Sequence, residues 1–290
     1  MSSAELAPFL ADAGLAGVWR RFLRNPAAVA GGVIVVLVVA LALFGPLLAP
    51  GSPIDGELGD RLAGPSGAHL LGTDALGRDQ LSRLLHGGRT TVLLAAGMMA
   101  VTALIAVLVG LVAGFLGGVV DAVLMRLSDI VLAFPSLVLA LAIAGFLGPG
   151  LTNMALALVA VWWASLARVV RGQVVALRGR GFMDAAVISG GRPTGIVARH
   201  VLRHVLGVVT VLATHDVAVL VLAIAGLSFL GLGASPPSPE WGRMLFDAKP
   251  YLATQPLVAL VPGIAITLTA VGFTLAGDGL RDALDPTGRS

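Results

Sequence analysis

Long stretches without a charged residue dominate this chain of 290 residues. The longest one extends from Ile130 to Ala167, well beyond the roughly 20 residues that a helix needs to cross the hydrocarbon core of a bilayer. Hydrophobic residues make up 57% of the sequence and charged residues only 12%, against roughly 25% charged residues in soluble domains. The chain is therefore predicted to be an all-α integral membrane protein with little mass outside the membrane.

Six transmembrane helices are predicted. The first apolar run is longer than the core of a cleavable signal peptide, so it is expected to remain as a helix. The longest run is split by Gly148-Pro149-Gly150, and Pro135 is expected to kink its first half. Gly97, Gly110 and Gly114 in the second helix are expected to let other helices approach closely. The predicted spans cover about 27–49, 90–120, 124–147, 151–170, 205–232 and 257–277.

The distribution of basic residues predicts the orientation. With a cytoplasmic N-terminus, 13 of the 19 Arg and Lys residues lie in cytoplasmic segments, as the positive-inside rule favours. Six crossings then place both termini in the cytoplasm. The predicted parts are a cytoplasmic segment 1–26, a first helix 27–49, an extracytoplasmic loop 50–90, a five-helix core 91–277 and a cytoplasmic tail 278–290. Within the core, 171–204 is a basic cytoplasmic loop and 233–256 an outer loop.

The chain lacks the residues for its own ATP chemistry. Its single lysine, Lys249, is followed by Pro250, whereas a P-loop needs Gly-Lys followed by Ser or Thr to hold phosphate and magnesium. Cysteine is absent, which excludes disulfides and thiolate sites. The chain is therefore expected not to be an enzyme and to bind no cofactor directly. Its basic residues are expected to set topology rather than to bind nucleic acid.

The basic cytoplasmic loop contains an acid followed by two alanines and, four residues later, a glycine. A short helix with a small alanine face can dock closely on another protein, and glycine can end or bend it. Met183, Asp184, Ala185, Ala186 and Gly190 are therefore candidates for coupling the chain to a cytosolic ATPase. On spacing alone, an amphipathic connector that only anchors at the membrane surface is the alternative.

Further motifs occur in order along the chain. They are Leu71-Gly72-Thr73-Asp74…Gly77-Arg78-Asp79 before the second span, Leu124-Met125-Arg126…Asp129 in the third, Gly226-Leu227-Ser228-Phe229 at the end of the fifth, Pro239-Glu240-Trp241-Gly242 after it, and Gly277-Asp278-Gly279-Leu280-Arg281-Asp282 at the end. Together with the alanine-rich loop, they resemble the C-type permease subunit of the dipeptide/oligopeptide/nickel class of ABC importers. The resemblance covers about residues 20–287.

This resemblance implies a type I ABC importer permease fold in the bacterial cytoplasmic membrane. It also implies a heterodimer with a homologous B-type permease, two ATPase subunits or one fused ATPase that carry ATP and magnesium, and an extracytoplasmic substrate-binding protein. The expected cargo is a di- or oligopeptide, with nickel or another chelate as the alternative. The sequence departs from the family at Asp184, where glutamate is usual, and at Arg203-His204, where Pro-Asn is usual.

Other polar residues have two interpretations each. His215 and Asp216 lie inside the fifth span, where ionisable residues face a cavity or a partner helix. They would serve a proton relay in a proton-coupled secondary transporter, a less favoured reading because no inverted repeat is evident; otherwise they form a helix–helix contact. Glu240, Trp241 and Arg243 either approach the pathway or the binding protein, or form a solvated cap.

His200 and His204 are spaced four apart, as two ligands on one helical face would be. The zincin pattern needs glutamate directly after the first histidine, and Val201 stands there. A surface or interface role is therefore favoured over metal binding.

Overall fold

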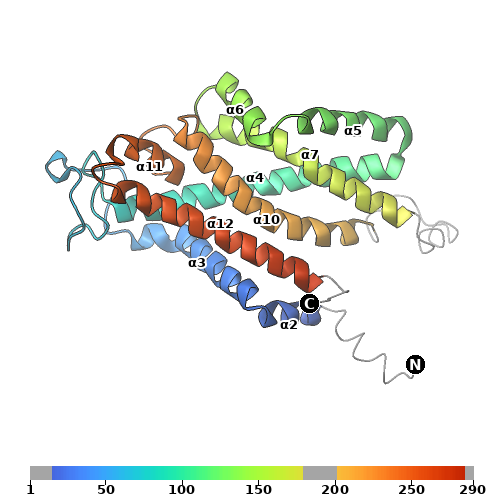
Figure 1. Cartoon of the computed structure of the whole chain (residues 1–290), viewed down its shortest axis with the longest axis horizontal. Coiled ribbons are helices and arrows are strands. Elements are labelled where there is room, and N and C mark those ends of the chain that lie inside the picture. The colour runs from blue at the N-terminus through green and yellow to red at the C-terminus, as the bar shows by residue number, and fades with distance from the viewer. Residues whose placement is uncertain (1–14, 179–200, 285–290) are drawn as a thin grey trace. The chain divides into compact units, whose positions relative to one another are not determined.

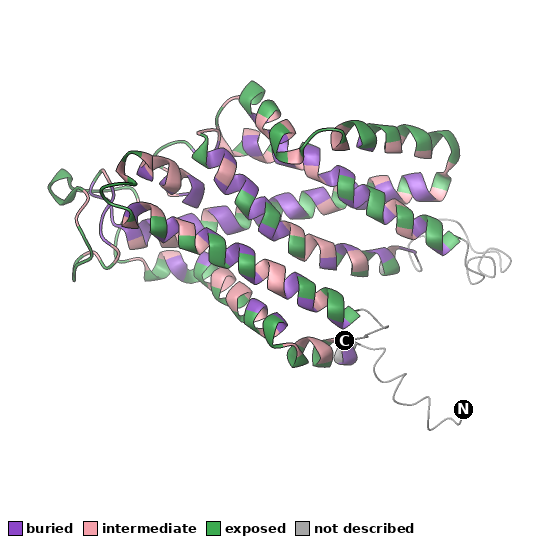
Figure 2. Ribbon diagram, viewed as in Figure 1, coloured by how far each residue is buried: buried purple, intermediate pink, exposed green. Residues whose placement is uncertain are grey.

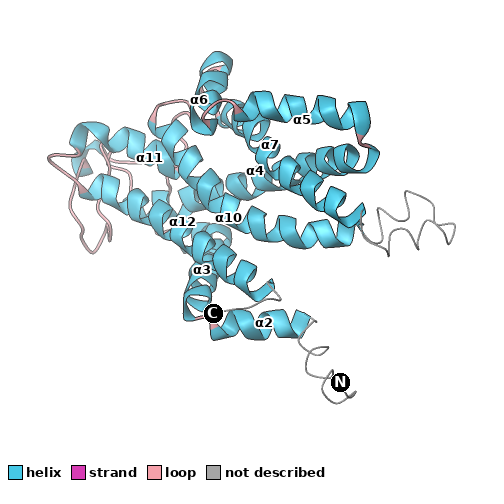
Figure 3. Cartoon of the chain, turned by 45° about the vertical axis from the view of Figure 1, so that its right-hand side comes forward, coloured by secondary structure: helices cyan, strands magenta, loops and turns pink. Residues whose placement is uncertain are grey.

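The computed structural model describes residues 15–178 and 201–284, and within these ranges the regular structure is helical (Figures 1 and 3). The α-helices are α2 (Leu15–Arg24), α3 (Pro26–Leu48), α4 (Gln80–Leu116), α5 (Gly118–Leu132), α6 (Ser136–Leu147), α7 (Leu151–Arg178), α10 (Leu202–Phe229), α11 (Trp241–Ala248) and α12 (Leu257–Leu284). Two short 3-10 turns, Leu58–Asp60 and Lys249–Tyr251, accompany them. The all-α prediction is confirmed.

Five of these helices are long and apolar enough to cross a membrane, and the pair α5 and α6 makes a sixth if it counts as one span. The break at Gly148-Pro149-Gly150 is where sequence predicted it, since α6 ends at Leu147 and α7 begins at Leu151. At Pro135 the chain turns more sharply than the predicted kink, because α5 and α6 are two separate helices at an angle of 87°. Proline lacks the N–H that a continuous helix would need there.

Several helices extend beyond their predicted apolar limits. α4 begins at Gln80, ten residues before the predicted start of the second span at Thr90. Its 37 residues correspond to about 55 Å, longer than the hydrocarbon core of about 30 Å. α7 likewise continues past Val170 to Arg178. Hydropathy identifies only the apolar, lipid-facing part of such helices. Their polar ends continue beyond this apolar part.

The chain forms two compact units. The described residues of the first unit are 15–93, 214–229 and 236–284. In it, α3 begins where the Asn25 side chain accepts hydrogen bonds from the backbone N–H groups of Ala27 and Ala28, with Pro26 at the first helical position. α3 then lies along α12 (Figure 1). A Cβ atom added at Gly31 would lie 2.6 Å from Ala276 N, so the two helices touch through their backbones.

The described residues of the second unit are 94–178, 201–213 and 230–235. α7 packs there against α5, α6 and the second half of α4. Added Cβ atoms at Gly110 and Gly114 would lie 2.5 and 2.7 Å from side-chain atoms of Val170 and Val174. The predicted close approach is thus present at these two glycines. At Gly97 no other atom lies within 4 Å of the added Cβ, so this glycine has no such role within the described residues.

Large apolar side chains cover the outer faces of several helices. α3 exposes Val33, Val36, Leu37, Leu41 and Phe44, and Figure 2 shows exposed residues along much of α3 and α5. A soluble protein rarely leaves contiguous apolar surface of this extent in water. The exposed faces fit contact with lipid or with another membrane subunit.

Candidate functional site

The loop before α4 is held in a tight turn by Asp74. Its Oδ1 atom accepts hydrogen bonds from the backbone N–H groups of Leu76 (2.8 Å) and Arg78 (3.0 Å). The turn passes through Gly77 with φ of +73°, where an added Cβ would lie 1.8 Å from the carbonyl oxygen of Glu57. Only glycine fits this position. The Gly-Thr-Asp…Gly-Arg-Asp motif therefore encodes a specific turn.

The last aspartate of that motif starts α4. Asp79 Oδ2 accepts a hydrogen bond from the N–H of Ser82 at 2.7 Å, as a helix-capping side chain does. Its other oxygen lies 3.0 Å from Nδ1 of His69, which fixes the loop to the helix. This cap explains why α4 begins before its apolar stretch.

Glu240 caps α11 in the same way. Its carboxylate accepts hydrogen bonds from the N–H groups of Gly242 (2.7 Å) and Arg243 (2.9 Å), and also from the hydroxyl of Thr91 (3.3 Å). The side chain is completely buried. Burial raises the pKa of the Glu240 carboxyl, although these hydrogen bonds and one with Ser228 act in the opposite direction. Glu240 is therefore an internal polar anchor rather than a solvated residue.

Trp241 fixes α11 against the start of α4. Its indole N–H donates to the carbonyl oxygen of Leu84 at 2.9 Å. Added Cβ atoms at Gly87 and Gly88 would meet Pro239 O at 2.0 Å and the Trp241 ring at 2.9 Å. The indole therefore fits only because glycines face it. The burial of Glu240 and Trp241 does not agree with the interpretation of this segment as a solvated cap.

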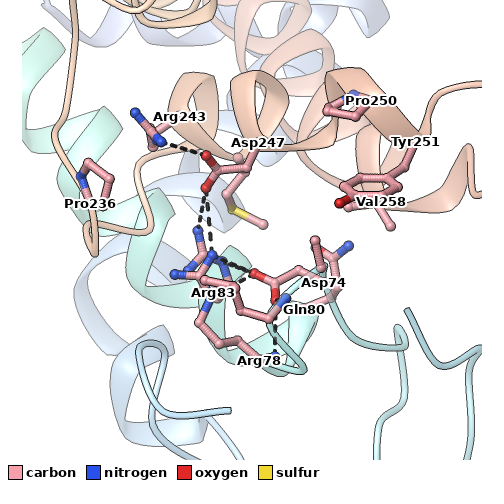
Figure 4. Close-up of a pocket in the computed structure, with 13 residues that line it drawn as sticks. Asp74, Arg78, Gln80, Arg83, Pro236, Arg243, Asp247, Pro250, Tyr251 and Val258 are labelled. Carbon is pink, nitrogen blue, oxygen red and sulfur yellow. Dashed lines mark hydrogen bonds and ion pairs between the residues drawn. The ribbon is translucent and has the colours of Figure 1, made fainter. Parts of the chain in front are cut away.

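Two charged residues of α11, Arg243 and Asp247, lie close to three charged residues at the start of α4 (Figure 4). These are Asp74 and Arg78 in the loop before α4 and Arg83 on α4 itself. We call these five residues the arginine–aspartate cluster. Arg78 Nη2 lies 2.7 Å from Asp74 Oδ2, and Arg243 Nη2 lies 2.8 Å from Asp247 Oδ1. Asp247 Oδ2 lies 3.6 Å from both Arg78 Nη2 and Arg83 Nη2. The cluster joins the α4 loop to α11 through charge.

A cavity of about 200 Å³ adjoins the cluster. All five cluster residues and Gln80 line it, and Met244, Tyr251 and Val258 contribute an apolar wall. Figure 4 shows Asp247 pointing from α11 toward Arg78 and Arg83, with Tyr251 and Val258 to one side. The cavity belongs entirely to the first unit.

His215 and Asp216 lie on α10 in the same unit, away from this cavity's lining. His215 Nδ1 is 3.8 Å from Asp216 Oδ1, and both side chains are partly exposed. The backbone of His215 approaches α12, since a Cβ added at Gly277 would lie 3.1 Å from its nitrogen. Among the described residues, the ion pair of His215 is with Asp216 alone.

In the second unit, arginines fix the last turns of α7. Arg171 donates two hydrogen bonds to Asp121, at 2.9 and 2.6 Å. Arg178 Nη1 donates to the carbonyl oxygen of Gly114 at 3.1 Å, and Arg168 pairs with Asp129. Bidentate arginine–carboxylate pairs hold their geometry better than single contacts. The end of α7 is therefore tied to α4 and α5.

The predicted ATPase-coupling residues Met183, Asp184, Ala185, Ala186 and Gly190 lie outside the described residues, as does His200. Their roles stay predictions. Within the described residues, no group of three or more His, Asp or Glu side chains is arranged to hold a metal ion.

Two protein-family models match the chain. The family described as binding-protein-dependent transport system inner membrane component matches residues 106–289, more than half of the sequence. The N-terminal TM domain of oligopeptide transport permease C matches residues 15–65. The chain belongs to the first of these families. The resemblance to C-type importer permeases is thereby confirmed, and with it the type I ABC permease fold.

Similar curated proteins cover nearly the full chain of this permease. The glutathione transport system permease protein GsiD of Pectobacterium atrosepticum is 41% identical over 271 residues, 92% of this chain and 89% of the relative. The dipeptide transport system permease protein DppC of Alkalihalophilus pseudofirmus is 39% identical over 274 residues, 94% and 90% of the two chains. The nickel transport system permease protein NikC of Escherichia coli is 39% identical over 254 residues, 88% and 92%. These relatives are permease subunits of ABC importers, not enzymes.

Sequence reasoning missed the arginine–aspartate cluster. Asp74 and Arg78 served there only to identify the family, without a role of their own, and Asp247 was placed in the outer loop 233–256. The signal that was present is the spacing of four residues in Asp74–Arg78 and in Arg243–Asp247, each of which forms an ion pair. Nothing in the sequence brings the two pairs together.

Proposed function

We propose that this permease forms half of the translocation pathway of an ATP-driven importer for di- or oligopeptides. The observation that carries this proposal is the similarity to a dipeptide permease at 39% identity over 94% of the chain. Relatives named for D,D-dipeptides and for glutathione, itself a small peptide, support the same cargo class. A complete importer would include a second, homologous permease, two ATPase subunits or one fused ATPase that bind ATP and magnesium, and an extracytoplasmic substrate-binding protein.

The test of the cargo is uptake into vesicles that contain the assembled complex and its binding protein. ATP-dependent accumulation of a labelled dipeptide is the expected result. A nickel chelate is the second candidate because the nickel permease NikC is equally similar in identity. ATP-dependent accumulation of labelled nickel without accumulation of any peptide would reject the peptide proposal.

We further infer that coupling passes through the cytoplasmic loop and the end of α7. The ties from Arg171 to Asp121 and from Arg178 to Gly114 make the last turns of α7 rigid within the second unit. A displacement imposed on the following segment 179–200 would then move α4 and α5 with α7. Alternating access needs such a link between the ATPases and the pathway.

The coupling residues are tested by Ala186→Arg. Docking through a small alanine face would leave the introduced guanidinium buried without a partner, at a cost of roughly 3–5 kcal/mol by analogy with broken buried ion pairs. We expect ATPase subunits to dissociate or to lose peptide-stimulated hydrolysis, while membrane insertion stays normal. Ala68→Arg, the same change in the exposed part of the 50–79 loop, is the control. Normal uptake by Ala186→Arg would remove this segment from the interface.

The proton-coupled alternative depends on His215 and Asp216. The double variant His215→Gln, Asp216→Asn keeps hydrogen-bonding groups and abolishes titration. An ATP-driven permease should retain ATP-dependent uptake in this variant. Uptake driven by an imposed pH gradient alone, and lost in the variant, would instead identify a secondary transporter.

A further inference from the structure

The cavity beside the arginine–aspartate cluster carries an excess of positive charge. Three guanidinium groups line it, from Arg78, Arg83 and Arg243, against two carboxylates, from Asp74 and Asp247. Four of the five side chains are less than one-fifth exposed, and Arg83 is 1% exposed. At neutral pH, with all five groups charged, the lining therefore has a net charge of +1. A buried charge without a counter-charge is costly.

Buried hydrogen-bond donors of the same lining have no partner among the described residues. They are Nε2 of Gln80, Nη2 of Arg83 and Nε of Arg243. Gln80 is 1% exposed, as buried as Arg83. Arg83 Nη2 lies 3.6 Å from Asp247 Oδ2, which is an ion-pair distance but too long for a hydrogen bond. Buried donors in native proteins nearly always have an acceptor.

We propose that this cavity binds one carboxylate group. A carboxylate offers two acceptor oxygens to guanidinium and amide donors, and its single negative charge balances the excess of one positive charge. A divalent anion would change the net charge of the site from +1 to −1, next to the carboxylates of Asp74 and Asp247. The volume of about 200 Å³ exceeds the share of one water molecule, about 30 Å³, several times over, which leaves room for a small organic acid.

The rival explanation is that the cluster is only a structural brace between the α4 loop and α11. A brace predicts no saturable response to an added anion. The proposal does not rest on which cargo the importer carries, so a failed peptide-uptake experiment leaves it standing. Direct binding to the purified full-length chain separates the two explanations.

The experiment measures acetate binding to the full-length chain in detergent by saturation-transfer NMR at neutral pH and constant ionic strength. Acetate should bind saturably, whereas acetamide, its neutral isostere, should give no saturable signal. Sulfate should compete only weakly. Absence of saturable acetate binding would overturn the proposal, and sulfate binding tighter than acetate would overturn the assignment to a monovalent carboxylate.

Variants locate the binding in the cavity. Arg243→Gln removes the excess charge and should weaken acetate binding by about tenfold or more, the range expected for one lost charge-assisted contact. Asp247→Asn raises the net charge to +2 and should tighten binding, an effect that misfolding cannot mimic. Arg89→Gln removes an exposed arginine of α4 outside the cavity and is the matched control. Equal affinities in Arg243→Gln and Arg89→Gln, or no gain in Asp247→Asn, would place acetate elsewhere.

Discussion

Glu240 shows how a single buried carboxylate organises the start of a helix. It satisfies two backbone N–H groups of α11 and links them to Thr91 on α4. Because the side chain is fully buried, water cannot replace these contacts. A change of charge or shape at this residue therefore affects both helices.

We expect Glu240→Gln to destabilise the protein by roughly 1–3 kcal/mol, because one acceptor oxygen becomes an NH₂ group that faces donors. The measurement is the thermal unfolding midpoint of the purified chain in detergent. Glu57→Gln, a change of the same type at an exposed site, should leave the midpoint unchanged. Equal midpoints for both variants would show that the cap contributes nothing to stability.

The buried carboxyl of Glu240 should also make the stability of the protein depend on pH. Burial raises the pKa of Glu240 in the folded protein above its unfolded value, so the folded state binds the proton more tightly. Its contribution to stability is complete below the unfolded pKa and is lost as pH rises through the folded pKa. Unfolding midpoints of the wild type should therefore fall over this interval more steeply than those of Glu240→Gln. Parallel pH profiles would contradict this account.

At the scale of elements, glycines decide which helices touch. Gly110 and Gly114 place the backbone of α4 directly against α7. A Cβ added at Gly97, on the same helix and in the same unit, would meet no atom of the described residues within 4 Å. Contacts between helices in a membrane depend on such close packing, because lipid provides no hydrophobic drive for association. The glycines of α4 are thus not equivalent.

Gly110→Ala should destabilise the purified chain, since the added methyl group would lie 2.5 Å from Val170 Cγ1 and 2.7 Å from the Ala167 carbonyl oxygen. Gly97→Ala should be neutral or stabilising by up to about 1 kcal/mol, because alanine favours helix over glycine. Thermal unfolding of the two variants gives the comparison. A larger loss for Gly97→Ala would show that α4 packs through a different face.

At the scale of the whole molecule, topology is the prediction that remains to be measured. The chain has no cysteine, so a single introduced cysteine reports its own location. With both termini cytoplasmic, Ala68→Cys should react with a membrane-impermeant maleimide in intact cells, and Ser290→Cys only after permeabilisation. The cysteine-free parent is the control. The reverse labelling pattern would invert the orientation and move the basic loop 171–204 outside.

The amino-acid sequence determined the helical spans and the family. A long stretch without charged residues indicates a membrane helix. Gly148-Pro149-Gly150 separates two such helices, because proline has no backbone N–H to donate and glycine adopts turn conformations easily. These are local effects, readable from neighbouring residues. The start of α4 could not be predicted from the apolar stretch, because hydropathy records lipid contact, whereas the capping by Asp79 begins the helix outside that stretch.

Only the tertiary structure decided how the polar residues combine. Asp74 with Arg78 and Arg243 with Asp247 are recognisable as two separate local pairs. Their union around one cavity depends on α11 packing beside the start of α4, which Trp241 and the glycines facing it make possible. The net charge of that cavity is a property of residues far apart in the chain. Because charge balance is set by distance in space, spacing along the sequence could not reveal it.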